Sequence, residues 1–224
     1  MSDSAFVKGG IPAIIRNDAN LYEGDLRHYF QTIFYYAKNN NHPYHNFRHM
    51  LHVTWLCHEA CFFYRSELSK RQMRNLLIAA LFHDFDHRGQ QGNDDLNINQ
   101  AIIGLHMYLL GADRKYFDEI SDLIRATEYP PVVHTFALSL SAQILCDADL
   151  SQALDPAWIQ QVVFGLAAEW KKAPFDVLSI EGPFHKNLKF HTRWARSRFT
   201  PTDLEKKIQE IQELTELLKI DVAA

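Results

Sequence analysis

Two histidines and two aspartates lie within five residues in the stretch His83-Asp84-Phe85-Asp86-His87. His83 and His87 are four positions apart, so on a helix both rings project from one face. Asp84 is adjacent to His83 and can enter the same coordination sphere. Imidazole with carboxylate suits a divalent cation, although a charged helix end that happens to contain two histidines has the same composition. This stretch is therefore the first candidate for a metal site.

Two further polar clusters lie upstream and downstream of this stretch. His45, His49 and His52 follow one another at intervals of four and three residues, which places them on a single helical face. Asp147 and Asp149 end an otherwise uncharged segment, and burying such a carboxylate is costly unless it is paired or bound to metal. Since each cluster ends an apolar helix, all three can converge on one site in a helical bundle.

The elements that must position these clusters are helical. Apolar residues recur at three- and four-residue steps from Leu26 to Ala37, from about Asn46 to Ser66, and from Met73 to Leu81. Ser69-Lys70-Arg71-Gln72 has the form of a capping box before the third of these. Further helices are expected at Leu96 to Leu110, Tyr116 to Ala126, His134 to Leu150, Asp155 to about Trp170, and after a second capping-box form at Thr202 to Glu205. Lys171 to Pro183 is expected to be irregular.

These patterns predict an all-α fold without convincing strands, a compact helical bundle in a single domain over residues 1–224. The formal charge of −4 gives no basic field for nucleic acid, and the three cysteines fit a reducing cytoplasm better than a disulfide framework. The amino terminus lacks the layout of a signal peptide, and no stretch has the character of a membrane span. A cytoplasmic, soluble protein is expected.

In their order along the chain, the three clusters resemble the HD-domain superfamily of metal-dependent phosphohydrolases. They resemble more closely the catalytic domain of class I cyclic nucleotide phosphodiesterases. Residues 45–49 match that family's HNxxH, residues 83–89 match its HDxDHxG, and residues 148–151 match its ADLS. The segment Leu166-Ala167-Ala168-Glu169-Trp170 is similar to the one that carries the family's conserved glutamate. The motif-bearing core covers about residues 44–170.

The resemblance implies a site with two divalent metal ions. His49, His83, Asp84 and Asp149 would bind the tighter ion, which would be Zn, Fe or Mn. Asp84 would bridge to a second ion, Mg or Mn, held mainly by water. Asp147 could replace Asp149 or simply cap a helix, and the family register favours Asp149. The implied reaction is attack on phosphorus by a metal-bridged hydroxide.

The resemblance also implies roles for residues around the metals. His45 would protonate the leaving oxygen as general acid, with Glu169 orienting or charging its ring. His87 would face the phosphate or a metal-bound water. Second-layer residues that could hold metal waters are Asn93, Asp94 and Asp95. His52 stands where the family usually has aspartate, so it either supports the ligands from just outside the metal site or is merely exposed.

The sequence departs from the family where substrate is chosen. The family clamps a purine with a conserved glutamine followed by phenylalanine, and residues 194–201 contain no glutamine. A basic run is found there instead, with Arg193 and Arg196 as candidate contacts to further phosphate or carboxylate groups on the substrate; a solvated surface segment is the alternative. The run consists of Lys186, Lys189, Arg193, Arg196 and Arg198.

The sequence therefore predicts a metal-dependent phosphohydrolase, either a phosphodiesterase or a phosphomonoesterase, whose partner is a small-molecule phosphate ester of nucleotide type. Neither a membrane nor nucleic acid is expected as a partner. The alternative is a metal-containing sensor or scaffold that binds a nucleotide without hydrolysing it. A complete pair of His45 and Glu169 favours catalysis.

Overall fold

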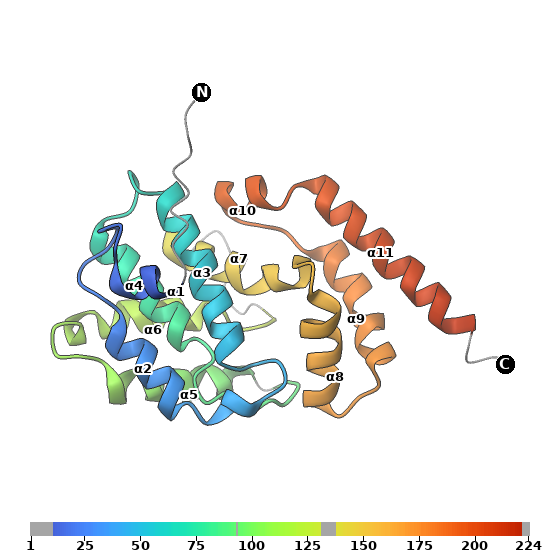
Figure 1. Cartoon of the computed structure of the whole chain (residues 1–224), viewed down its shortest axis with the longest axis horizontal. Helices are drawn as coiled ribbons and strands as arrows, with labels where there is room; N and C mark the ends of the chain where they lie inside the picture. Colours follow the sequence, from blue (N-terminus) through green and yellow to red (C-terminus); the bar gives the residue numbers. More distant parts are fainter. Residues whose placement is uncertain (1–10, 93, 131–137, 221–224) are drawn as a thin grey trace.

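A computed structural model describes residues 11–92, 94–130 and 138–220, and every regular element in these ranges is helical (Figure 1). The predicted all-α class is confirmed. In chain order the α-helices are α1 (Ile11–Arg16), α2 (Arg27–Tyr36), α3 (Phe47–Phe63), α4 (Lys70–Phe82), α5 (Asp94–Tyr108), α6 (Phe117–Arg125), α7 (Leu140–Leu150), α8 (Phe164–Trp170), α9 (Pro174–Asn187), α10 (Arg193–Arg198) and α11 (Pro201–Ile220).

Helix α4 is the centre of the larger hydrophobic core. Every residue from Met73 to Phe82 is buried, and α4 packs against α2, α3, α5, α6 and α7. The predicted capping box begins the helix, because the Ser69 hydroxyl accepts from the Gln72 N–H and the Gln72 side chain accepts from the Ser69 N–H. The helix ends at Phe82, so the packing of α4 fixes the position of the motif that starts at His83.

A smaller core is formed by α8, α9, α11 and the segment before α8. Its buried side chains are Trp158, Val162, Val163, Leu166, Ala167, Val177, Leu178 and Ile211. In Figure 1 these helices lie side by side, apart from the helices around α4. The chain thus brings two apolar clusters together, and the elements that end between them can form a pocket.

Helix α9 contradicts the expectation of an irregular segment at Lys171 to Pro183. Pro174 stands at the first helical position, where its missing N–H costs nothing, and Asp176 lies in the first turn. Lys186 lies in the last turn, where positive charge interacts favourably with the helix dipole. Pro183 lies inside the helix instead of ending it. The capping and charge pattern, together with burial of the Val177 face, overrides the single proline.

Three other helix starts differ from the sequence expectation. Helix α7, in the segment predicted from His134, begins at Leu140, where the Ser139 side chain accepts from the Ala142 N–H. The first part of that prediction, residues 134–137, lies outside the described ranges. Helix α11 is capped two residues earlier than predicted, by reciprocal bonds between Thr200 and Asp203. The segment after Asp155 begins with a π-helical turn, Ile159–Val163, before α8.

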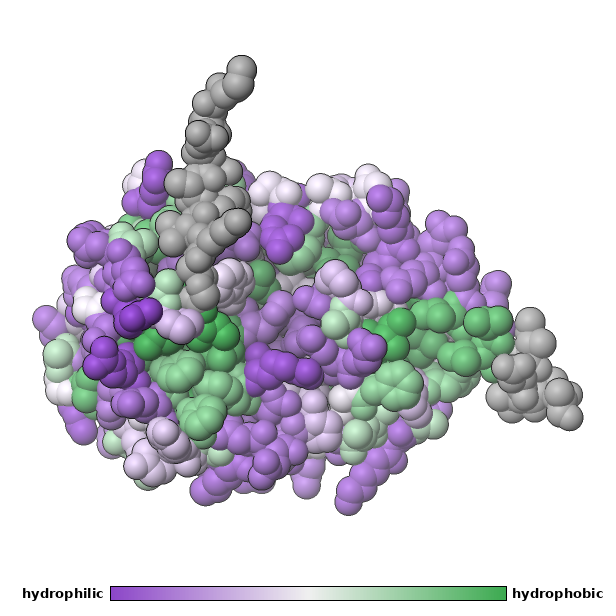
Figure 2. Space-filling model, in the orientation of Figure 1, coloured by the Kyte–Doolittle hydropathy of each residue, from purple (hydrophilic) through white to green (hydrophobic). Residues whose placement is uncertain are grey.

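The surface in Figure 2 is mostly polar, with apolar side chains gathered near α2 and beside α11. Exposed apolar residues on these elements include Phe34 and Leu217. Within the described ranges, no helix has the length and apolar character needed to cross a bilayer.

Candidate active site

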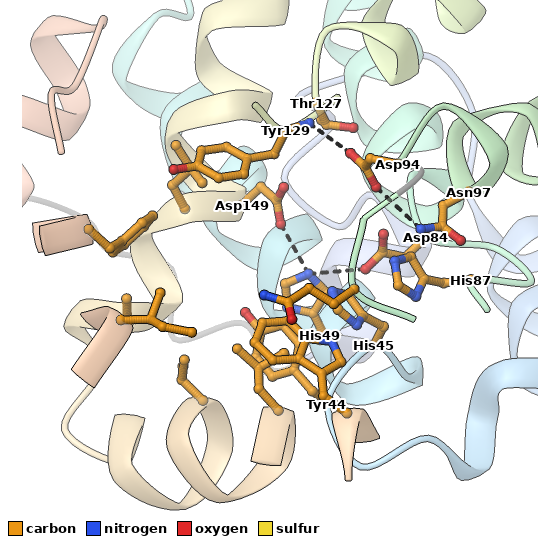
Figure 3. A pocket seen from close by; sticks show the side chains of 18 of the residues that line it. Tyr44, His45, His49, Asp84, His87, Asp94, Asn97, Thr127, Tyr129 and Asp149 are labelled. Atoms are coloured by element: carbon orange, nitrogen blue, oxygen red, sulfur yellow. Dashed lines mark hydrogen bonds and ion pairs between the residues drawn. The ribbon is translucent and has the colours of Figure 1, made fainter. Parts of the chain in front are cut away.

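Three helix ends position the candidate metal ligands. His49 lies in the first turn of α3, which Asn46 caps by accepting from the His49 N–H at 3.3 Å. His83 and Asp84 follow directly after α4, and Asp149 lies in the last turn of α7. In Figure 3 the ring of His49 lies between the carboxylates of Asp84 and Asp149.

Donor atoms of His49, His83 and Asp149 all lie within 4.8 Å of one another, and the Asp84 carboxylate faces both rings. His49 Nε2 lies 3.0 Å from Asp149 Oδ1, 3.3 Å from Asp84 Oδ2 and 3.2 Å from His83 Nε2. His83 Nε2 lies 3.5 Å from each of the same two carboxylate oxygens. Two ligands that each sit about 2.1 Å from one ion are about 3.0–3.4 Å apart at octahedral or tetrahedral angles. The spacing of His49, His83 and Asp149 therefore fits a single bound cation, with Asp84 at its edge.

The hydrogen bonds on the far sides of the two rings leave both Nε2 atoms as acceptors. The Nδ1–H of His83 donates to the Ala80 carbonyl at 2.9 Å, and that of His49 donates to Gln152 Oε1 at 2.5 Å. Asp84 Oδ2 is buried and has no hydrogen-bond partner among the described residues. When both rings are neutral, two imidazole lone pairs face the two carboxylates, an arrangement that a divalent cation stabilises in place of a proton.

The electrostatics of the cluster also favour a positive charge at this position. Burial disfavours the charged His83 ring, but the charges of Asp84 and Asp149 outweigh it and raise the pKa of His83 to about 9. Burial would raise the pKa of both carboxyls, yet the surrounding histidines lower the pKa of Asp84 and of Asp149. A metal ion would satisfy the same carboxylates.

His45 and Glu169 form a second functional unit beside the cluster. Glu169 Oε2 accepts from the backbone N–H groups of Tyr44 and His45 at 2.9 and 3.0 Å, and Oε1 lies 2.5 Å from His45 Nδ1. Although burial opposes ionisation, the bond to His45 lowers the pKa of Glu169 to about 2. Burial likewise lowers the pKa of His45, but Glu169 outweighs it and the net shift is upward. The ring is held through Nδ1 and keeps Nε2 for proton transfer.

His87 stacks on His45 and stays outside the group of converging donors. The ring centroids are 3.7 Å apart, with 21° between the planes. The Gly89 N–H donates to His87 Nδ1 at 3.0 Å, so a neutral His87 carries its proton on Nε2. Burial, followed by the charge of His45, lowers the pKa of His87 to about 4. His87 is thus a neutral hydrogen-bond donor on the pocket wall.

A cavity of about 480 Å³ opens from the cluster toward α8 and α9. His45, His49, Asp84, His87 and Asp149 line its polar end. The apolar lining comprises Leu150, Ala153, Val162, Leu166, Trp170, Ile180, Pro183 and Phe184. Pockets of this size and composition accommodate small organic ligands.

Glu181 lines the same cavity and is a residue that the sequence interpretation missed. It is 5% exposed, and its Oε2 atom has no hydrogen-bond partner in the part of the chain described. Burial raises the pKa of this carboxyl to about 7. Helix α9 places Glu181 one turn before Phe184 and His185, and no sequence motif marks this carboxylate.

The structure distinguishes Asp149 from its alternative, Asp147. Asp147 is buried and accepts from the backbone N–H groups of His191 and Thr192 at 2.9 and 2.8 Å. It therefore holds the chain that leads into α10, while Asp149 faces the cluster. His52 is not among the residues that line the cavity.

Of the predicted second-layer residues, Asp94 lines the cavity and Asp95 does not. Asp94 accepts from the Tyr129 N–H at 2.7 Å and from the Asn97 side chain at 3.3 Å, as Figure 3 shows. These bonds tie the start of α5 to the loop after α6. Asn93 lies outside the described residues.

Arg193 and Arg196, predicted as substrate contacts, do not line the cavity. Arg193 pairs with Glu67 at 2.6 Å, and Arg196 donates to the carbonyls of Phe190 and His191. None of the five basic residues of the run lines the cavity. The sequence showed the charge of both arginines but not their acceptors. Glu67 is distant in the chain from Arg193, and Arg196 bonds to backbone carbonyls of the segment just before it.

Comparison with known proteins supports the phosphodiesterase resemblance for part of the chain. The sequence model of a protein family described as 3'5'-cyclic nucleotide phosphodiesterase matches residues 44–106. This match includes both histidine motifs, and it ends before Asp149 and Glu169. No curated protein matches the chain. The chain is thus similar to this phosphodiesterase family across its first two motifs, and the fold brings the remaining two residues to the same place.

Proposed function

We propose that this protein is a metal-dependent phosphohydrolase that cleaves a phosphate ester, most suitably a nucleotide-type phosphodiester. The observation that carries the proposal is a group of three converging ligand atoms, from His49, His83 and Asp149, with Asp84 against both rings and a separately anchored histidine–glutamate pair beside them. The family match over residues 44–106 supports hydrolysis of a phosphodiester.

His49, His83, Asp84 and Asp149 would hold the tighter ion, and Asp84 would share its carboxylate with a second ion. Divalent ions at this position activate water and offset the charge that develops on the phosphate. The ligand histidines contribute by presenting Nε2 lone pairs, since each Nδ1 proton is bound elsewhere. Their imidazoles suit Zn, Fe or Mn, whereas a more hydrated second position suits Mg or Mn.

His45 would protonate the oxygen that leaves phosphorus. Glu169 keeps the ring oriented through Nδ1 and raises its pKa, so the acid form is populated closer to neutral pH. His87 lies against the same ring and would donate its Nε2–H to a phosphate oxygen. In both rings Nδ1 is already hydrogen-bonded, so Nε2 is the atom that would exchange or donate a proton to the substrate.

The cavity beyond the phosphate position suits the base of a nucleotide. Its walls from Leu166, Trp170 and Phe184 offer apolar surface to a flat group, and Glu181 offers acceptor oxygens to N–H groups on that base. This supports a nucleotide over a simple alkyl phosphate as the substrate.

The test is hydrolysis by the metal-loaded protein. With Mn²⁺ we expect turnover of bis(4-nitrophenyl) phosphate and of at least one member of a panel of cyclic and linear nucleotides. Asp84→Ala should lose bound transition metal and activity together, whereas Arg196→Ala, remote from the cavity, should retain both. Nucleotide binding without turnover would favour a sensor. Full metal content in Asp84→Ala would refute the assigned metal site.

A further inference from the structure

The two histidines of the cluster are oriented by different kinds of acceptor. His83 donates to a backbone carbonyl, which can only accept. His49 faces the side-chain amide of Gln152 instead. An amide carries an acceptor at one end and donors at the other, so turning it over would point N–H groups at His49 Nδ1. The His49 proton would then move to Nε2, the atom that faces Asp84 and Asp149.

Gln161 supplies the contact that fixes the direction of the Gln152 amide. Gln152 is 1% exposed, and its Nε2 donates to Gln161 Oε1 at 2.7 Å. Gln161 lies in the π-helical turn Ile159–Val163, an uncommon conformation that is concentrated at functional sites. This turn continues directly into α8, the helix that carries Glu169.

We propose that Gln152 and Gln161 form a positioning relay for His49. Gln161 orients the Gln152 amide, and Gln152 then holds the His49 proton on Nδ1 so that the Nε2 lone pair faces the metal. This inference rests on the metal site of the proposed function and adds two positioning residues to it. Outer partners of this kind fix the tautomer of a ligand histidine and raise its basicity, and losing one lowers metal affinity by about 10–100-fold.

Calorimetric titration of the full chain with Zn²⁺ tests the relay without any substrate. Gln152→Leu keeps the volume but removes the acceptor, so we expect about 10–100-fold weaker binding. Gln152→Glu keeps an acceptor and should bind at least as tightly as the native protein. As a matched control, Gln143→Leu removes an amide that donates to the Leu138 carbonyl, and it should not change the affinity.

Two substitutions at Gln161 test the orientation step. Gln161→Glu can only accept, so it keeps the Gln152 amide in its present direction and should retain native affinity. Gln161→Leu frees the amide to turn, and two equally populated orientations would weaken binding about twofold. If Gln152→Leu does not fold, equal affinities for Gln161→Glu and Gln161→Leu would overturn the relay.

Nitrogen-15 spectra of the Zn²⁺-loaded protein read the tautomer directly. We expect a protected Nδ1–H signal from His49 in the native protein and in Gln152→Glu, and loss of that protection in Gln152→Leu. Native Zn²⁺ affinity in a folded Gln152→Leu variant, or a His49 proton on Nε2, would overturn the relay alone. Failure of the native protein to bind Zn²⁺ would overturn the metal site as well, so the two failures are distinguishable.

Discussion

Gly89 lies where a single methyl group should damage proton donation and spare the metal site. Its backbone is left-handed, with φ at +68°, and a Cβ there would lie 3.0 Å from Glu169 Cγ and 3.1 Å from two ring atoms of His42. Left-handed backbone costs a residue other than glycine about 1–2 kcal/mol. Relieving contacts this short adds about 1–3 kcal/mol of overpacking.

Since Glu169 accepts three hydrogen bonds that orient His45, its displacement should impair the general acid. Small misplacements of catalytic groups cost about 100-fold, so we expect Gly89→Ala to lower kcat by about 10–100-fold when the leaving group is an alkoxide. A nitrophenolate leaves without protonation, and turnover of its esters should fall much less. Zn²⁺ affinity should not change, because Glu169 is not among the proposed ligands of that ion.

Gly24→Ala is the matched control for the cost of a left-handed backbone. Gly24 has φ at +65°, but a Cβ there would meet only the Arg74 guanidinium, at an ordinary 3.4 Å. This variant should lose about 1–2 kcal/mol of stability and no activity. The reasoning is refuted if Gly89→Ala slows both classes of ester equally, or if Gly24→Ala loses activity to the same degree.

Three further predictions concern charged groups. Glu169→Gln removes the group that raises the pKa of His45, so the alkaline limb of kcat/KM for an alkoxide ester should move to lower pH; an unchanged profile would argue against His45 as the acid. Burial opposes ionisation of Asp113, but bonds led by that from Arg74 lower the pKa of Asp113 to about 2. The resulting stability exists above the unfolded pKa of about 3.9 and is lost as pH falls toward 2. Urea titration should therefore show Asp113→Ala destabilised by about 3–5 kcal/mol at pH 7 and by about 2 kcal/mol less at pH 2. Burial raises the pKa of Glu181 to about 7. Between pH 7 and the unfolded value of about 4.3, the folded protein binds a proton that the unfolded chain has lost, so the free energy of unfolding falls as pH rises through that window. Glu181→Gln should therefore raise Tm at pH 8 more than at pH 4 while weakening nucleotide binding, and equal Tm gains at both pH values would contradict this.

The larger core and its helices could be predicted because their signals are local. The period of apolar residues and the capping box of Ser69 and Gln72 are properties of short windows, and α4 follows both. Helix α9 could not be predicted from the same rules, because Pro183 is a strong local stop signal that packing of the Val177 face overrides. Tertiary burial decides such cases, and it is not visible in a short window.

The candidate site shows the same division. Motif spacing identified His49, His83, Asp84 and Asp149 as candidate ligands, and the ends of α3, α4 and α7 bring their side chains together. No sequence motif marks Gln152 or Glu181, because the role of an amide or a carboxylate depends on the groups that surround it in the fold. The charge of Arg193 suggested a substrate contact, but sequence alone did not show that it pairs with Glu67, which is distant in the chain.

The two hydrophobic cores contribute different parts of the proposed chemistry. Residues around α4 fix the two ligands that follow it, while α8 and α9 supply Glu169, Trp170 and Glu181. Two of the connections between these parts are the bond from the backbone before α3 to Glu169 and the bond from Gln152 to Gln161 before α8. A substrate that bridges the ligands and the apolar wall would be aligned with His45 only while both connections hold. Proton donation should therefore be more sensitive than metal binding to changes in the packing between the two cores.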